Sequence, residues 1–222
     1  MEEINMRVLE NCETKQVFYY FEEICKIPHG SRNTKQISDY LVAFAKEHGF
    51  DYVQDEMNNV IIYKPATPGY ENAPTVILQG HMDMVCEKRP DVQHDFEKDG
   101  LNLSVKDGYV TANGTTLGGD DGIAVAYALA LLDSTDLPHP ALEVLITVDE
   151  EIGLLGAVGL DCSVLKGKRM INMDSDAEGS LWISCAGGLS AVSHIPVARV
   201  DAEGENLQIK VCGLMGGHSG SE

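Results

Sequence analysis

The chain has 222 residues, of which 44% are hydrophobic, so it can build a sizeable core and is not a disordered chain. Its formal net charge of −19 argues against nucleic acid and anionic membrane surfaces as partners. The cysteines form no C-x-x-C pair, and the acidic N-terminus lacks the apolar core of a signal peptide. We therefore expect a cytoplasmic protein with reduced thiols and no membrane span.

Two amphipathic helices are predicted in the first fifty residues. Residues 14–26 carry apolar side chains at helical spacing, and a Pro-His-Gly-Ser sequence then ends that helix. His29 within this break is expected to be exposed or bonded to the backbone rather than catalytic. The second helix has Asn33 or Thr34 as its N-cap, and Gly49 follows its last turn.

Strands and helices alternate through the middle of the chain. Strands are predicted at residues 50–54, 60–63, 76–78, 101–105, 109–112, 142–148 and 169–173. A helix that is apolar on nearly every face, and therefore buried, is expected at 117–132, and a short one ends near residue 160. This order predicts an α/β three-layer sandwich, in which helices flank a mostly parallel sheet. Further strands are predicted at residues 180–185, 189–197 and 207–211.

Ionisable side chains follow directly after three of the predicted strands. They are His81 and Asp83, the pair Glu150 and Glu151, and Asp174. In such sheets ligands bind beyond the carboxyl ends of the strands, so these side chains are expected to converge at one edge. His81 and Asp83 are two positions apart and share a face if the chain stays extended. A carboxylate can then hold one ring nitrogen while the other binds a metal.

Each acidic cluster taken alone has a simple structural explanation. Asp120-Asp121 would cap a helix, Glu150-Glu151 would begin a solvated helix, and Asp174-Ser-Asp176 would form an Asx-turn. Together, however, these carboxylates would repel one another at one sheet edge unless a cation lies among them. The nearest candidate, Arg169, lies at the opposite end of its strand. We therefore expect a divalent metal.

The types of side chain indicate which metal this is. One imidazole with several carboxylates suits zinc, cobalt or manganese better than calcium. There are more carboxylates than one ion needs, which suggests two ions about 3.5–4 Å apart with a bridging aspartate. The adjacent pair Glu150-Glu151 would allow one glutamate to ligate while the other acts as a general base.

With these residues the chain resembles the metal-dependent exopeptidases and amidohydrolases that include aminoacylase, carboxypeptidase G, peptidase T and the Xaa-His dipeptidases. Within that family its motifs look most like those of the aminoacyl-histidine (Xaa-His) dipeptidases. The matching segments are Gly80-His-Met-Asp-Met-Val-Cys86, Thr116-Leu-Gly-Gly-Asp-Asp-Gly-Ile-Ala124, Thr147-Val-Asp-Glu-Glu-Ile-Gly153, Asn172-Met-Asp-Ser-Asp176 and Gly216-Gly-His-Ser-Gly220.

The resemblance implies a set of metal ligands. His81 and Asp174 would bind one ion, Asp120 would bridge both ions, and Glu151 would bind the second. The ions would be zinc, with cobalt or manganese as alternatives. The resemblance also implies a cis peptide bond between Asp120 and Asp121.

The resemblance further implies three catalytic roles. Glu150 would be the general base, and Asp83 would orient His81. His218 would approach the oxygen of the scissile carbonyl. The implied reaction is hydrolysis of the amide bond of Xaa-His dipeptides by a metal-bound hydroxide.

The domain organisation follows from the same resemblance. Residues 1–186 would be the N-terminal part of a catalytic domain, and 187–222 the beginning of a smaller α+β lid or dimerisation domain, so that the complete protein is a homodimer. The family takes one more metal-binding histidine from near its C-terminus, so this chain is expected to be an incomplete fragment.

Three other functions remain open. An N-acyl amino acid deacylase of the same family would use the same metals with a different pocket. Magnesium-dependent phosphoryl transfer would need a phosphate cradle, and the chain has no G-x-x-x-x-G-K-[ST] sequence. An inactive peptide-binding or dimerisation module would be expected to lose a ligand or Glu150, yet all the positions present match.

Overall fold

A five-stranded sheet organises the first part of the chain. The computed structural model describes residues 7–175, 177–185, 187, 191–201, 203–205 and 207–213. The chain divides into two compact units, Met1–Glu178 and Gly179–Glu222. The helices are α1 (Lys15–Cys25), α2 (Lys35–Glu47), α3 (Gly119–Asp133), α4 (Leu155–Gly159) and the 3₁₀ helix η1 (Cys162–Val164). The strands are β1 (Asp51–Gln54), β2 (Val60–Lys64), β3 (Val76–His81), β4 (Leu103–Lys106), β5 (Tyr109–Ala112), β6 (Leu142–Thr147) and β7 (Arg169–Asn172).

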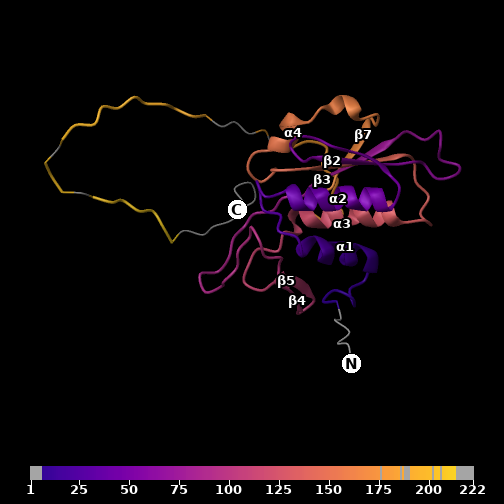
Figure 1. The fold of residues 1–222 in the computed structure, drawn as a ribbon, viewed down its shortest axis with the longest axis horizontal. Coiled ribbons are helices and arrows are strands. Elements are labelled where there is room, and N and C mark those ends of the chain that lie inside the picture. Colours follow the sequence, from indigo (N-terminus) through magenta and orange to yellow (C-terminus); the bar gives the residue numbers. More distant parts are fainter. Residues whose placement is uncertain are drawn as a thin grey trace. The chain divides into compact units, whose positions relative to one another are not determined.

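The sheet is mixed rather than mostly parallel. Its strand order is β1-β2-β6-β3-β7, and the pairings β6–β3 and β3–β7 are parallel, whereas β1–β2 and β2–β6 are antiparallel (Figure 1). The short turn between β1 and β2 allows only an antiparallel pair. In this turn the Asp55 side chain accepts hydrogen bonds from the backbone N–H groups of Met57 and Asn59. The prediction of a mostly parallel sheet missed that antiparallel half.

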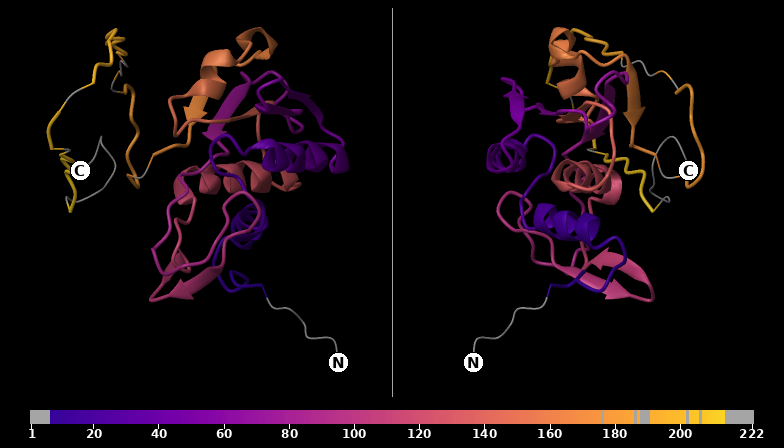
Figure 2. Two further views of the ribbon diagram at one scale, coloured as in Figure 1. Left: turned by 60° about the vertical axis from the view of Figure 1, so that its left-hand side comes forward. Right: turned by 90° about the vertical axis from the view of Figure 1, so that its right-hand side faces the viewer.

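Helices cover both faces of this sheet, as the three-layer prediction requires. On one face α2 and α3 pack against the strands, and α1 packs on α3 (Figures 1 and 2). On the other face the segment around α4 and η1 supplies Leu160, Val164 and Leu165, which pack against Ile61, Ile77 and Leu145 of the sheet. The α/β prediction is thus confirmed.

The helix α3 lies between α1 and the sheet, which explains its apolar sequence. Val125, Ala126 and Ala128 are fully buried. An added Cβ at Gly122 would lie 3.3 Å from Phe21 Cε2, so the glycine lets α1 approach closely. A helix buried on opposite sides has no polar face, and this accounts for the nearly continuous apolar run. The prediction of a buried helix here is confirmed.

The strands predicted after residue 179 are wrong for the part of the chain that the structure describes. Its described residues in Gly179–Glu222 contain no strand. Apolar side chains there are almost fully exposed, among them Leu181, Ile183 and Ile209. An alternating apolar pattern favours extended chain, but a strand forms only when a partner strand completes its hydrogen bonds. The boundary between domains at residues 186 and 187 stays a prediction.

None of the described helices combines the length and apolarity needed to cross a membrane.

Candidate metal centre

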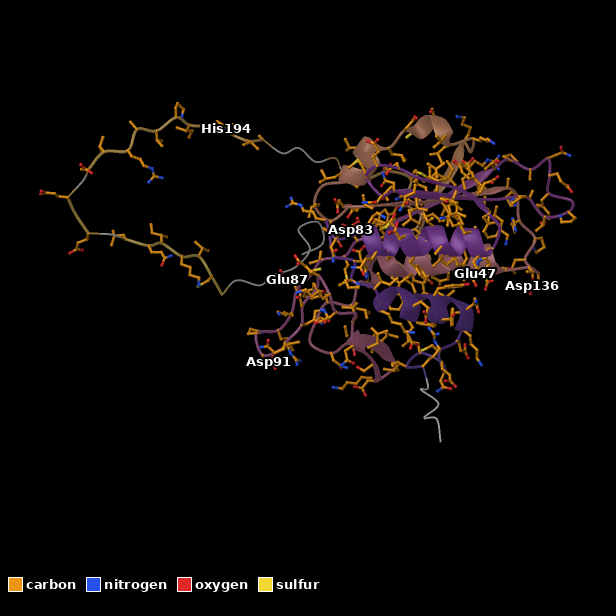
Figure 3. All side chains as sticks on the ribbon, in the orientation of Figure 1. Glu47, Asp83, Glu87, Asp91, Asp136 and His194 are labelled. Carbon is orange, nitrogen blue, oxygen red and sulfur yellow. The ribbon has the colours of Figure 1, made fainter. Side chains whose placement is uncertain are left out.

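The carboxyl ends of the three parallel strands bring the predicted ionisable residues together. His81 is the last residue of β3, and its parallel partner is Thr147, the last residue of β6. Asn172 at the end of β7 pairs with Gln79. Because the three strands end at the same edge, the residues that follow β6 and β7 lie beside His81. Figure 3 shows this edge at Asp83, at the end of the helical layer away from Glu47, the last residue of α2.

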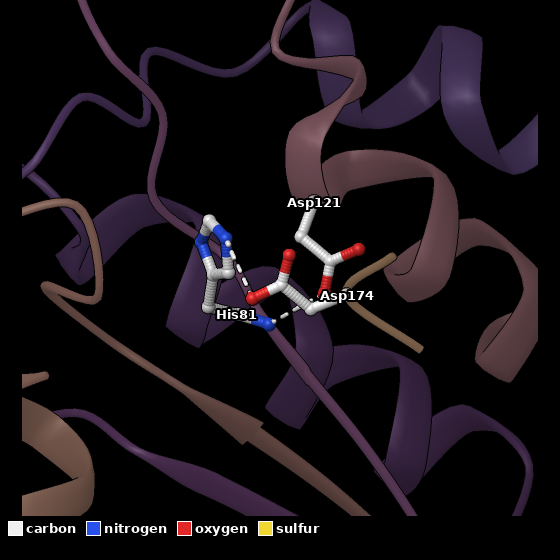
Figure 4. A group of neighbouring side chains, drawn as sticks. All are labelled: His81, Asp121 and Asp174. Atoms are coloured by element: carbon white, nitrogen blue, oxygen red, sulfur yellow. Dashed lines mark hydrogen bonds and ion pairs between the residues drawn. The ribbon is translucent and has the colours of Figure 1, made fainter. Parts of the chain in front are cut away.

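One ring nitrogen of His81 faces a group of carboxylates. His81 is 1% exposed. Its Nε2 lies 3.1 Å from Asp120 Oδ1, 3.8 Å from Glu150 Oε2 and 3.9 Å from Asp174 Oδ2. Figure 4 shows Asp174 beside the imidazole ring. Carboxylates from three separate elements therefore surround one nitrogen atom.

The other ring nitrogen of His81 faces Asp83. Nδ1 lies 3.0 Å from the backbone oxygen of Asp83 and 3.3 Å from its Oδ1. The same carboxylate accepts hydrogen bonds from Glu150 N and Glu151 N, at 3.0 and 3.3 Å, and from Ser31 Oγ at 2.8 Å. With a metal ion bound, a proton held on Nδ1 by Asp83 would leave the lone pair of Nε2 for the ion, which is how a metal-binding histidine is arranged.

The twin aspartates before α3 have different environments. The peptide bond between Asp120 and Asp121 is cis, as the resemblance implied, and neither residue has helical backbone angles. The Asp120 side chain is 63% exposed, whereas Asp121 is only 2% exposed and its Oδ2 accepts a hydrogen bond from the backbone N–H of His81. An added Cβ at Gly80 would lie 2.6 Å from Asp121 Oδ2, so only glycine allows this approach. The N-cap residue of α3 is Gly118 rather than either aspartate, contrary to the simpler explanation.

The charges in this group are poorly balanced without a cation. Burial opposes protonation of His81, but hydrogen bonds to Asp120 and Asp83 outweigh it and raise the pKa of His81 to about 11. Burial, and then the charges of Asp174 and Asp120, raise the pKa of Asp121 to about 7, although His81 opposes the change. Burial and neighbouring carboxylates also raise the pKa of both Glu150 and Glu151. A single imidazolium thus cannot compensate the carboxylates, and a divalent cation fits this donor set.

Two overlapping groups have the geometry to hold a metal ion. His81, Asp121 and Asp174 form one, and His81, Glu150 and Glu151 form the other. Within each group the ligand atoms lie within 4.8 Å of one another. The resemblance implied Asp120 as a ligand and did not point to Asp121, which belongs to the first of these groups. The adjacent pair Asp120-Asp121 was the available sequence signal. Which of the two side chains turns inward depends on the backbone at the start of α3.

Two further histidines were considered in the sequence. His29 is buried, and its Nδ1 is 2.6 Å from the backbone oxygen of Ile27, so it is bonded to the backbone as expected. His218 lies outside the described residues, as does Asp176. The role predicted for His218 therefore stays a prediction.

The fold places this histidine–carboxylate group, a candidate metal site, at the carboxyl edge of an α/β sheet. Residues 77–182 match the profile of peptidase family M20/M25/M40.

Several known proteins are similar to most of this chain. It is 42% identical to the cytosol non-specific dipeptidase of Escherichia coli (strain K12) over 219 residues, which is 98% of this chain and 45% of the relative. The crystal structure of aminoacylhistidine dipeptidase from Vibrio alginolyticus superposes with a TM-score of 0.76 at 44% identity, covering 81% of this chain and 36% of that one. A tripeptidase from Staphylococcus aureus gives 0.62 at 27% identity, covering 73% and 44%. The chain thus spans less than half the length of these relatives.

Proposed function

We propose that this chain carries part of a metal-dependent dipeptidase that hydrolyses the amide bond of aminoacyl-histidine dipeptides. The observation that supports this most is the group of Asp120, Glu150 and Asp174 carboxylates within 3.9 Å of one nitrogen of His81. Two relatives supply the substrate class, because one is named a dipeptidase and the other an aminoacylhistidine dipeptidase.

The proposed cofactor is a pair of zinc ions, with cobalt or manganese as alternatives. His81 and Asp174 would hold one ion, Glu151 the other, and Asp120 would bridge them. Asp121 borders the first of these positions and is a further candidate ligand. When bound, the ions would supply Lewis acidity that polarises the scissile carbonyl and makes a water molecule more acidic.

Glu150 is the proposed general base. Burial and the nearby carboxylates raise its pKa, and its side chain is 28% exposed, so it can reach water and substrate. It would take a proton from the attacking water and deliver it to the amine that leaves. Its backbone N–H is bound to Asp83, so the carboxylate that orients His81 also positions the base. His218 would stabilise the charge that develops on the carbonyl oxygen.

The remaining features are proposed from the same relatives. A smaller domain that begins near residue 187 would form a homodimer interface, and the complete protein would act in the cytosol, as the name of the Escherichia coli relative indicates for that enzyme. The peptide substrate would be small.

Replacing the general base tests the proposed function. In the active enzyme that contains this sequence, Glu150→Gln should lower kcat for aminoacyl-histidine dipeptides by at least about 100-fold. The reason is that general-base catalysis typically contributes about 10²–10⁴-fold. Metal content, measured by mass spectrometry, should not change. Glu47→Gln is the matched control, because Glu47 lies at the far end of α2 (Figure 3). Full turnover by Glu150→Gln would exclude Glu150 as the base.

A substrate panel separates the related functions. Aminoacyl-histidine dipeptides should be cleaved faster than tripeptides and N-acyl amino acids. A preference for N-acyl amino acids would instead identify a deacylase with the same metals. Metal binding without any hydrolysis would favour an inactive binding module.

A further inference from the structure

The carboxylate of Asp83 links His81 to the segment that carries both glutamates. Its Oδ1 lies 3.3 Å from His81 Nδ1 and accepts a hydrogen bond from Glu150 N at 3.0 Å, while its Oδ2 accepts one from Glu151 N at 3.3 Å. Asp83 is 1% exposed, so water cannot replace a lost partner. Whatever fixes the position of Asp83 therefore also fixes the imidazole and the glutamate backbone.

Ser31 binds this carboxylate from a distant part of the sequence. Its Oγ donates a hydrogen bond to Asp83 Oδ2 at 2.8 Å, across 52 residues of chain. The serine is itself held, because Ser31 N donates to Met84 O at 3.3 Å and Met84 N donates to His29 O at 3.2 Å. Gly30 and Met84 form a parallel β-bridge. The hydroxyl is thus presented by a backbone that is fastened beside the carboxylate.

The residue after Ser31 contacts the glutamate segment as well. Arg32 N donates a hydrogen bond to Asp149 Oδ1 at 2.6 Å, and Asp149 directly precedes Glu150. Both Arg32 and Asp149 have positive φ angles, so the two chains turn sharply where they meet. Residues 29–32 therefore contact both the segment that follows His81 and the segment that carries Glu150 and Glu151.

We propose that Ser31 is a positioning residue of this centre, whose hydroxyl fixes Asp83 and, through Asp83, the His81 ring and the backbone of Glu150 and Glu151. Its effect on metal binding rests on the proposed function, whereas its effect on the glutamate backbone does not. An ordinary structural serine would contribute to stability alone. A positioning serine would in addition change metal affinity and the hydrogen exchange of the glutamate backbone.

Metal affinity is the first measurement. For the 222-residue chain, competition with a chromophoric chelator should show that Ser31→Ala weakens zinc binding about 10-fold or more, the effect typical of residues that support metal ligands. Ser31→Thr keeps the hydroxyl and should stay within about threefold of the wild type. The matched control is Ser38→Ala, because Ser38, although more buried than Ser31, also donates its hydroxyl to an oxygen acceptor, Asn58 O, away from the centre. Its affinity should not change.

Hydrogen exchange in the metal-free chain is the second measurement. With a chelator present, Ser31→Ala should speed exchange of the Glu150 and Glu151 amides by at least about threefold, because their acceptor is no longer held. Ser38→Ala should not. If Ser31→Ala fails to fold, Ser31→Cys, with its weaker donor, is measured in the same two ways.

The outcomes separate the two proposals. A wild-type chain that binds no zinc would contradict the metal centre, while faster exchange in Ser31→Ala would still support the positioning role. Unchanged exchange and unchanged affinity in Ser31→Ala, with only a loss of thermal stability like that of Ser38→Ala, would overturn it. An equal loss of zinc affinity in Ser31→Ala and Ser38→Ala would also overturn the positioning role.

Discussion

Asp83 and Asp121 are buried to nearly the same extent, yet their pKa values shift in opposite directions. Burial alone would raise the pKa of Asp83, but hydrogen bonds from His81, the Glu150 amide and Ser31 lower it. Asp121 accepts a hydrogen bond from the backbone of His81 but also faces the charges of Asp174 and Asp120, so its pKa rises to about 7. Hydrogen-bond donors rather than depth decide which carboxylate stays ionised.

The raised pKa of Asp121 predicts a pH dependence of the metal-free chain. An acid whose folded pKa lies above its unfolded value of 3.8 stabilises the fold at low pH, and this contribution is lost as the pH rises through about 7. Asp121→Asn removes that titration. Between pH 5 and 8 the free energy of unfolding of the wild type should therefore fall by about 1–3 kcal/mol relative to the variant.

Chemical denaturation in a chelator, at several pH values, measures this difference. Saturating zinc should cancel the loss in the wild type, because a bound cation favours the ionised carboxylate. If the free energies of unfolding of the metal-free wild type and Asp121→Asn change with pH in the same way, the pKa of Asp121 is not raised and the prediction is contradicted.

At the scale of elements, α3 has two unusual ends. It begins at the Asp120–Asp121 cis peptide bond rather than at a side-chain cap. At its other end Lys64 Nζ, from β2, donates hydrogen bonds to the backbone oxygens of Leu131, Leu132 and Ser134 at 2.9, 2.9 and 2.6 Å. This cation satisfies carbonyl groups that the helix leaves free and fastens α3 to the sheet.

Removing the ammonium group of Lys64 at the C-terminal end of α3 should lower the stability of the fold but leave metal binding unchanged. Lys64→Met keeps most of the side-chain volume and should lower the free energy of unfolding by about 1–3 kcal/mol, since partly buried carbonyls lose a charged donor. Lys15→Met, at an exposed position, is the control and should change it by less than about 0.5 kcal/mol. Zinc affinity should be the same in both. Weaker zinc binding by Lys64→Met would show that the two ends of α3 are coupled.

Helices and strands were predictable where their signal is local. The helix expected at 14–26 is observed at Lys15–Cys25, because apolar spacing and the Pro-His-Gly break act over a few residues. The convergence of His81 with the glutamates was predictable too, since parallel strands share an edge. The inward turn of Asp121 was not, because it requires the space beside Gly80, where an added Cβ would lie 2.6 Å from Asp121 Oδ2.

At the scale of the whole molecule, the least predictable part is the second unit. The apolar alternation around residues 180–185 favours a strand, but strand formation depends on a partner that a local pattern does not specify. The described residues of that unit leave Trp182 and Ile183 largely exposed. By contrast, every described residue of the candidate centre lies in Met1–Glu178. The proposed metal centre can therefore be tested through the side chains of Met1–Glu178.

Anomalous diffraction from crystals of the zinc-loaded protein tests this claim most directly. Zinc bound at this centre should give anomalous peaks at the zinc edge within about 2.0–2.2 Å of His81 Nε2 and of carboxylate oxygens from Asp174, Glu151 and Asp120. Zinc bound only at other places, with no peak beside His81, would contradict it.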